Sequence, residues 1–308
     1  MQSRWIVTIL LLVLAFVLPG DVSAQSTSLE DASIEDATVN LYCRVKTAGR
    51  TYSTSGSGVF IHENGTILTN AHVAQYFLLP EEGRTTARCM VRTGSPAKDQ
   101  YRAKLVYLSP AWAQNVIEAT TKNQPSRGTG EFDFALLRVI GAKRGEIPDR
   151  FPALVPDLDS GGFDDGMEVI AAGYPSAGVR YRDMQNKLAQ AHAETYLTSV
   201  QSFALPHHDV LVLAPSPLSA AGVSGGPIVF PSGEVIGIAT TVKESAKSGN
   251  DRSLRAITLS YIDRILRTTL GFSLANYSAL SGMIELDTRA EPYVGLAQTI
   301  EQTLRNTR

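Results

Sequence analysis

Short stretches in which apolar and polar residues alternate run along most of the chain, and this period predicts β-strands. The expected strands lie at residues 39–45, 56–61, 66–70, 86–91, 101–108, 131–139, 168–175, 209–214, 234–239 and 255–259. Asn64-Gly65 separates two of them and is a strong signal for a β-hairpin. His72 follows the returning strand, in a segment at residues 71–74 that we expect to form a helical turn.

The predicted strands fall into two sets. Residues 141–166, rich in Gly, Pro and Asp, separate the sets and form the best linker candidate. Residues 109–130 read as a long surface insertion with a helical piece near residues 113–121. Helical spacing returns at residues 260–270 and 293–304. We therefore expect an all-β protein with an N-terminal half at residues 25–145, a C-terminal half at residues 146–272 and a C-terminal tail at residues 273–308.

The N-terminus has the pattern of a targeting segment. Arg4 precedes an apolar run at residues 5–18, Pro19-Gly20 ends the run, and small residues lead to Ala24. This pattern predicts a signal peptide at residues 1–24 and a secreted or periplasmic protein. An uncleaved membrane anchor is the alternative, although the run is shorter than the roughly 20 apolar residues that span a bilayer.

Composition narrows the function classes. The chain has 308 residues, of which 44% are hydrophobic, and its formal net charge is -2. This suffices for substantial cores, while scattered Lys and Arg give no electrostatic case for nucleic acid binding. Cys43 and Cys89 either form a disulfide, as an exported protein allows, or remain two buried thiols. The sequence leaves both open, because it does not give the distance between their Cα atoms.

A serine lies in a glycine-rich stretch at residues 220–227, AAGVSGGP, between two apolar runs. We call this stretch the serine turn. Glycine permits positive φ and a close approach of the backbone to a ligand. The amides of Gly222 and Ser224 could then stabilise an oxyanion. On its own, the segment is equally well explained as a loop between two strands.

Two further residues supply what a serine nucleophile lacks. Ser224 needs a base within reach, and His72 titrates near neutrality. Asp133 lies in an apolar strand, where a carboxylate is costly unless it is paired, and it could orient His72. Taken singly, such residues are more often structural. Their order along the chain is that of a serine protease triad, whereas the α/β-hydrolase order needs a histidine after Ser224, and none follows.

The residues around this triad resemble those of trypsin-like serine proteases. The motifs are TNAHV at 69–73, FDFALL at 132–137 and GVSGGP at 222–227. GSG at 56–58, GYP at 173–175 and GEVIGI at 233–238 are similar to the bacterial HtrA-like branch. The resemblance covers about residues 39–265 and implies two six-stranded antiparallel β-barrels that place the active site between them. It also implies peptide-bond hydrolysis through an acyl-enzyme, and the residues after the barrels are too few for a PDZ domain.

The resemblance also bears on substrate recognition. Leu218 stands six positions before the serine, where relatives that cleave after Lys or Arg carry an acidic residue. A basic side chain would be desolvated there without a partner, so we expect small or medium apolar residues before the cleaved bond. The strand near Ala239, Thr240 and Thr241 is expected to pair with the substrate backbone. Val223 stands where many relatives have Asp or Asn, so its side chain cannot hydrogen-bond to the serine turn.

We therefore expect a secreted serine endopeptidase that acts on protein or peptide substrates and needs no cofactor and no metal. The sequence His207-His208-Asp209 could ligate a metal, but no second cluster of ligands stands at suitable spacing. The alternative is a binding module that keeps the protease fold with little hydrolysis, which Val223 and the insertion at residues 109–130 motivate. The oligomeric state and any regulation by the insertion or the tail stay open.

Overall fold

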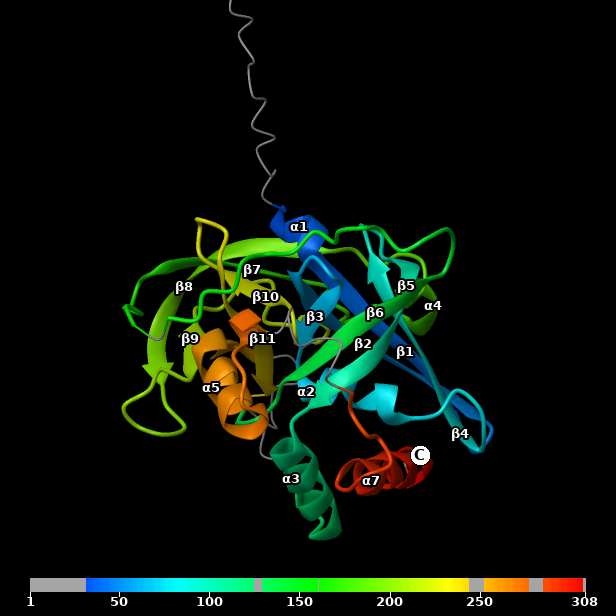
Figure 1. The fold of residues 1–308 in the computed structure, drawn as a ribbon. Helices are drawn as coiled ribbons and strands as arrows, with labels where there is room; N and C mark the ends of the chain where they lie inside the picture. Colours follow the sequence, from blue (N-terminus) through cyan, green and yellow to red (C-terminus); the bar gives the residue numbers. More distant parts are fainter. Residues whose placement is uncertain (1–31, 125–128, 160, 244–251, 277–284, 307–308) are drawn as a thin grey trace, which may run out of the picture. The chain divides into compact units, whose positions relative to one another are not determined.

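The computed structural model describes residues 32–124, 129–159, 161–243, 252–276 and 285–306. The expected signal peptide at residues 1–24 lies outside the described residues. Within the described ranges the strands close into two six-stranded antiparallel β-barrels (Figure 1). The expected all-β fold with two barrels is confirmed.

The first barrel has the strand order β1-β2-β3-β6-β5-β4. Its strands are β1 (Thr38–Thr47), β2 (Arg50–His62), β3 (Thr66–Thr69), β4 (Thr85–Thr93), β5 (Lys98–Leu108) and β6 (Ala135–Ala142). The hairpin from β2 to β3 turns at Asn64-Gly65, where Gly65 has a φ of +82°. The Asn64 side chain accepts hydrogen bonds from the amide and the hydroxyl of Thr66. The local sequence therefore forms this turn without help from distant residues.

The second barrel has the strand order β10-β11-β12-β9-β8-β7. Its strands are β7 (Glu168–Gly173), β8 (Ala191–Gln201), β9 (Val210–Leu213), β10 (Pro227–Val229), β11 (Val235–Lys243) and β12 (Arg252–Thr258). The serine turn connects β9 to β10, so its position depends on this barrel. The two expected halves thus correspond to barrels at residues 38–142 and 168–258, joined by residues 143–167.

Helices cover parts of both barrels. They are α1 (Ile34–Ala37), α2 (Ala71–Ala74), η1 (Gln75–Leu78), α3 (Pro110–Thr121), α4 (Tyr181–Met184), α5 (Leu259–Leu270), η2 (Leu274–Asn276) and α7 (Tyr293–Asn306). The insertion folds as α3 because the Ser109 hydroxyl caps the amide of Trp112 and Pro110 occupies the first turn. Figure 1 shows α3 beside α7, and these two helices are in contact.

The C-terminal helix packs on the first barrel, since its apolar face completes that barrel's core. Tyr293, Leu296 and Ile300 of α7 are buried in one cluster with Trp112 of α3 and strand residues such as Val91. A second cluster joins both barrels to α5, and a third fills the second barrel. The tail expected at residues 273–308 therefore includes a helix that belongs to the core of the first barrel.

Asp133 does not lie inside a strand, and that expectation was wrong. The structure places it in a loop just before β6, which begins at Ala135. Phe132 takes a positive φ of +58° there, a conformation that breaks the extended run. The apolar residues on either side of Asp133 gave a strand-like pattern, but its carboxylate is turned toward α2.

The two cysteines form a disulfide. Cys43 in β1 and Cys89 in β4 lie directly opposite each other in the antiparallel register. Their Cα atoms are 4.0 Å apart. The sequence left open whether these cysteines form a disulfide. The pairing of β1 with β4 brings them together, although β2 and β3 lie between these strands in the sequence.

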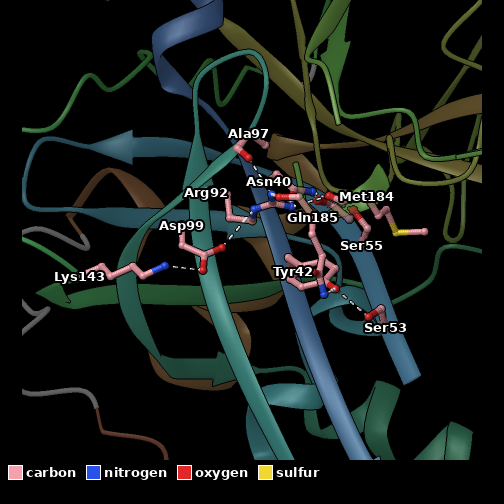
Figure 2. A network of polar contacts seen from close by, with 11 residues as sticks. Asn40, Tyr42, Ser53, Ser55, Arg92, Ala97, Asp99, Lys143, Met184 and Gln185 are labelled. Carbon is pink, nitrogen blue, oxygen red and sulfur yellow. Dashed lines mark hydrogen bonds and ion pairs between the residues drawn. The ribbon is translucent and has the colours of Figure 1, made fainter. Parts of the chain in front are cut away.

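Arg92 of β4 ties the first barrel to the segment between β7 and β8 (Figure 2). Its side chain is almost completely buried. The guanidinium donates to the carbonyl oxygens of Met184 and Gln185, and it donates to Ala97 at 2.6 Å. It also pairs with Asp99 at 3.3 Å. One buried cation therefore holds the α4 segment of the second barrel against the first.

Candidate active site

His72 and Asp133 meet at the edge of the first barrel. The His72 Nδ1 atom lies 2.7 Å from Asp133 Oδ2, and the His72 backbone amide donates to Asp133 Oδ1 at 2.9 Å. The Asn70 side chain donates to the backbone carbonyl of Asp133 at 2.9 Å, which fixes the loop. Both carboxylate oxygens are therefore engaged, and one ring nitrogen of His72 is committed to Asp133.

The environment raises the pKa of His72. Burial lowers the pKa, but the charge of Asp133 and its hydrogen bond raise the pKa more, so the net shift is upward. The positive charge of Arg252 acts in the opposite direction and lowers the pKa. The His72 side chain keeps 41% of its surface exposed, so substrate and solvent can reach the ring.

Ser224 comes from the second barrel and is 6% exposed. Its hydroxyl oxygen lies 3.5 Å from the Thr241 hydroxyl of β11. Among the described residues, no hydrogen bond joins Ser224 to His72. Catalytic hydrogen bonds are often long before a substrate binds.

Glycines let the serine turn pack closely against the first barrel. Gly225 has a φ of +88°, and its amide donates to the carbonyl of Ala239 at 2.8 Å. A Cβ atom at this position would overlap the carbonyl oxygen of Ser57 and the hydroxyl of Thr69. No larger residue can take this place without shifting β2 or β3.

The peptide plane before Gly222 is fixed by its carbonyl group. The carbonyl oxygen of Ala221 accepts a hydrogen bond from the Ser176 amide at 2.7 Å. In a trans peptide the N–H points opposite to the C=O. The amide of Gly222 therefore points away from Ser176, and it makes no hydrogen bond within the described residues.

The peptide plane before Ser224 is held in the same way. The carbonyl oxygen of Val223 accepts a hydrogen bond from the Gly226 amide at 2.9 Å. The N–H of Ser224 points in the direction opposite to that carbonyl group. It also has no acceptor in the part of the chain that the structure describes. The turn thus holds two amide groups that are free to donate.

Ser57 of β2 braces the serine turn from the first barrel. Its backbone amide donates to the carbonyl oxygen of Ser224 at 2.8 Å, and its hydroxyl donates to that of Gly222 at 2.8 Å. The same hydroxyl accepts from the Tyr174 amide at 2.9 Å. Val223 is buried in the second barrel's core instead of bonding to the turn. Ser57 therefore supplies the bracing that the Val223 side chain cannot.

A cavity of about 1040 Å³ brings these groups together. His72, Asp133 and Ser224 line it, as do Gly222 and residues of α3. We call it the central cavity. The α3 wall consists of Trp112, Asn115, Val116, Glu118 and Ala119. The insertion therefore shapes one side of the site, and α7 supports it from behind.

The predicted substrate-binding residues divide into two groups. Thr240 and Thr241 line the central cavity. Leu218 and Ala239 are buried in the core of the second barrel and are not among the lining residues. The Ala239 amide donates to the carbonyl of Gly226, and its carbonyl accepts from Gly225. The Ala239 amide is thus already used by the serine turn.

Sequence reasoning missed Arg252. It lies at the start of β12, half-buried, and lines the central cavity beside Thr241. Its residue type and its polar surroundings in the sequence gave no signal. Only the antiparallel pairing of β11 with β12, which sets Lys243 opposite Arg252, brings it near Ser224.

Two further findings concern metal binding and membrane spanning in the part of the chain that the structure describes. No group of three or more His, Cys, Asp or Glu side chains there could hold a metal ion. His207-His208-Asp209 is no exception, because Asp209 pairs with Arg264 at 2.5 Å. No helix in these ranges has the length and the apolar character needed to cross a membrane.

Comparison with known proteins agrees with the fold. The model of the trypsin-like peptidase domain matches residues 56–238, which include His72, Asp133 and Ser224. A search of curated proteins found no match to the chain. Since the matched segment covers more than half of the 308 residues and both barrels contribute to it, the chain belongs to the trypsin-like peptidase domain family.

Proposed function

We propose that this chain is a serine endopeptidase that uses Ser224, His72 and Asp133 as its triad. The Ser224 hydroxyl oxygen attacks the peptide carbonyl carbon, and His72 accepts the hydroxyl proton. His72 then gives that proton to the leaving amine as the C–N bond breaks. A water molecule attacks the acyl-enzyme by the same route and releases the carboxylic acid. Membership of a peptidase family implies protein or peptide substrates.

The contact between His72 Nδ1 and Asp133 Oδ2 carries this proposal. It leaves the other ring nitrogen as the only one available to accept a proton, and it stabilises the imidazolium that forms. A surface histidine in a purely structural role would not need a carboxylate that is itself buried and held by a backbone amide. The shared cavity adds support, because Ser224 opens into the same space.

The amides of Gly222 and Ser224 are the proposed oxyanion hole. Both peptide planes are held by hydrogen bonds to their carbonyl groups, so the donors need little rearrangement when charge develops. These contacts favour an enzyme over the alternative of a binding module with little hydrolysis.

We propose that basic residues are disfavoured before the cleaved bond, and that small or medium apolar residues are accepted there. Leu218 provides no acidic partner for a Lys or Arg side chain. The positive charge of Arg252 in the central cavity acts in the same direction. The motifs at residues 56–58 and 173–175 support placing the chain in the HtrA-like branch. Ser57 of the first motif contacts the serine turn, and Tyr174 of the second contacts Ser57.

We also propose that the chain is exported after cleavage at Ala24. The disulfide between Cys43 and Cys89 supports this, because disulfides persist mainly in oxidising compartments. Recovering the protein from the medium or the periplasm and sequencing its N-terminus tests the proposal. A chain that begins at Gln25 supports it, and a chain that keeps residues 1–24 in a membrane fraction contradicts it.

A fluorophosphonate probe tests the enzyme proposal on the purified mature chain. The probe reacts with an activated serine, so the wild type is expected to be labelled and to cleave an unfolded protein substrate. Ser224→Ala should abolish labelling and lower turnover by about 10⁶-fold, and His72→Ala should also prevent labelling. A folded wild type that neither reacts nor cleaves would support the binding module instead.

A further inference from the structure

Arg252 lines the central cavity, and the proposed hydrolysis steps give it no role. Its Nη1 atom donates to the Thr241 hydroxyl at 3.1 Å, and that hydroxyl lies 3.5 Å from Ser224 Oγ. A single side chain therefore separates the guanidinium from the proposed nucleophile. Arg252 and His72 also line the same cavity.

Most N–H groups of the Arg252 side chain donate no hydrogen bond within the described residues. A guanidinium carries five N–H groups, and the hydrogen bond to the Thr241 hydroxyl uses one of them. No carboxylate in those ranges forms an ion pair with it. None of the acidic residues that line the cavity pairs with it: Asp133 binds His72, Glu118 binds Lys122, and Glu131 is exposed on the loop before β6.

A half-buried cation without an anionic partner is costly in a structure, and a planar guanidinium matches a carboxylate with two parallel hydrogen bonds. We propose that Arg252 recognises an acidic side chain of the substrate, on one of the two residues that precede the cleaved bond. This inference rests on the proposed function, and it names the substrate class of the same site.

The position follows from the Thr241 contact. The strand near Thr240 and Thr241 is the one expected to pair with the substrate backbone, so we place the side chains that precede the cleaved bond next to β11 and β12. Thr240, Thr241, Val242 and Arg252 of these strands line the cavity. An acidic residue at the second position before the bond agrees with the apolar preference proposed for the first position. An acidic residue at the first position would instead contradict that apolar preference.

The test compares matched fluorogenic peptides that differ only by Glu or Gln at each of the two positions. The wild type is expected to prefer Glu by about tenfold or more in kcat/KM at one position, as for a hydrogen bond between charged groups. The ratio of kcat/KM for the Glu peptide to that for the Gln peptide should fall toward one in Arg252→Gln. The ratio should be intermediate in Arg252→Lys, which keeps the charge but loses the planar guanidinium. Lys122→Gln is the control, because Lys122 also lines the cavity but is exposed and paired with Glu118.

A binding measurement separates this inference from the proposed function. The Ser224→Ala protein is titrated with the same peptides, so no hydrolysis is needed. About tenfold tighter binding of the Glu peptide, lost in the Ser224→Ala, Arg252→Gln double variant, supports the inference even for a chain that does not cleave. Equal binding of the Glu and Gln peptides at both positions overturns it, and so does a Glu preference that survives Arg252→Gln. Probe labelling reports on the proposed function alone.

Discussion

Asp133 shows how one buried carboxylate can be satisfied and used at the same time. Its two oxygens accept hydrogen bonds from the ring and from the backbone amide of His72. The Asn70 side chain fixes the loop that carries Asp133 by donating to the Asp133 backbone carbonyl. Burial of a carboxylate costs less when both of its oxygens accept hydrogen bonds. The charge of Asp133 and its hydrogen bond raise the pKa of His72 against the effect of burial.

The pH profile should report this pair. Protonated His72 cannot accept a proton, so kcat/KM should fall as the pH drops through the raised pKa of His72, above its usual value of about 6.5. Asp133→Asn removes the cause of the increase, so the midpoint should move to lower pH. The rate should also fall by about 10⁴-fold, because the histidine loses its orientation. The measurement is kcat/KM from pH 4 to 9 for both proteins, and an unchanged midpoint would contradict the assignment.

The stability that the His72–Asp133 pair contributes has the opposite pH dependence to the expected activity. Because the pKa is higher in the folded state, the His72–Asp133 interaction contributes its full stabilisation below the unfolded pKa of about 6.5. That contribution is lost as the pH rises through the folded pKa. The pH that favours the proposed catalysis is therefore the one at which this pair stabilises the fold least.

At the scale of elements, the serine turn depends on β2. Ser57 holds two carbonyl groups of the turn, and Gly225 has no space for a side chain against the same strand. A turn from the second barrel is thus shaped by a strand of the first. The contacts between the serine turn and β2 must be kept for the amides of Gly222 and Ser224 to stay in place.

Ser57→Ala tests the brace. Loss of the hydroxyl leaves the Gly222 carbonyl and the Tyr174 amide without a partner, which should cost about 1–3 kcal/mol of stability. We expect kcat to fall at least about tenfold with little change in KM, because the oxyanion donors act in the transition state. Ser53→Ala is the control, since Ser53 lies in the same strand but bonds to Tyr42 outside the cavity lining. Equal kcat for the two variants would argue against the brace.

At the scale of the whole molecule, one cluster of buried side chains and a few polar contacts hold the two barrels together. Arg92 is a charged residue in these contacts that is almost completely buried. It reaches from β4 to the carbonyl groups of Met184 and Gln185, and the ring of Tyr42 lies against its guanidinium (Figure 2). The segment it holds leads from β7, whose end contacts Ser57, to β8.

Arg92→Met should therefore destabilise the molecule strongly. The substitution leaves several buried carbonyl groups without a donor, and we expect a loss of about 3–5 kcal/mol in the free energy of unfolding. Lys104→Met removes an exposed ion pair with Glu285 and should cost less than about 1 kcal/mol. Urea denaturation of the three proteins measures the difference. Similar midpoints for the wild type and Arg92→Met would show that the contact is not needed.

Much of the architecture could be predicted because its signals are local. Alternation in residues 39–45 and the Asn64-Gly65 turn depend on neighbours in the chain, and they became β1 and the β2–β3 hairpin. Asp133 was misplaced in a strand because apolar neighbours alone cannot reveal a residue with positive φ at Phe132. The triad was proposed from the order of its residues, and its assignment stays a prediction.

The chain's local patterns were sufficient for the strands, the turns and the residue types suited to acyl transfer, since side-chain period and glycine chemistry act within a few positions. Three features needed the closed barrels: the Cys43–Cys89 disulfide, the brace at Ser57 and the position of Arg252. They join residues that are 11 to 165 positions apart in the sequence, and the pairing of strands brings these residues within bonding distance.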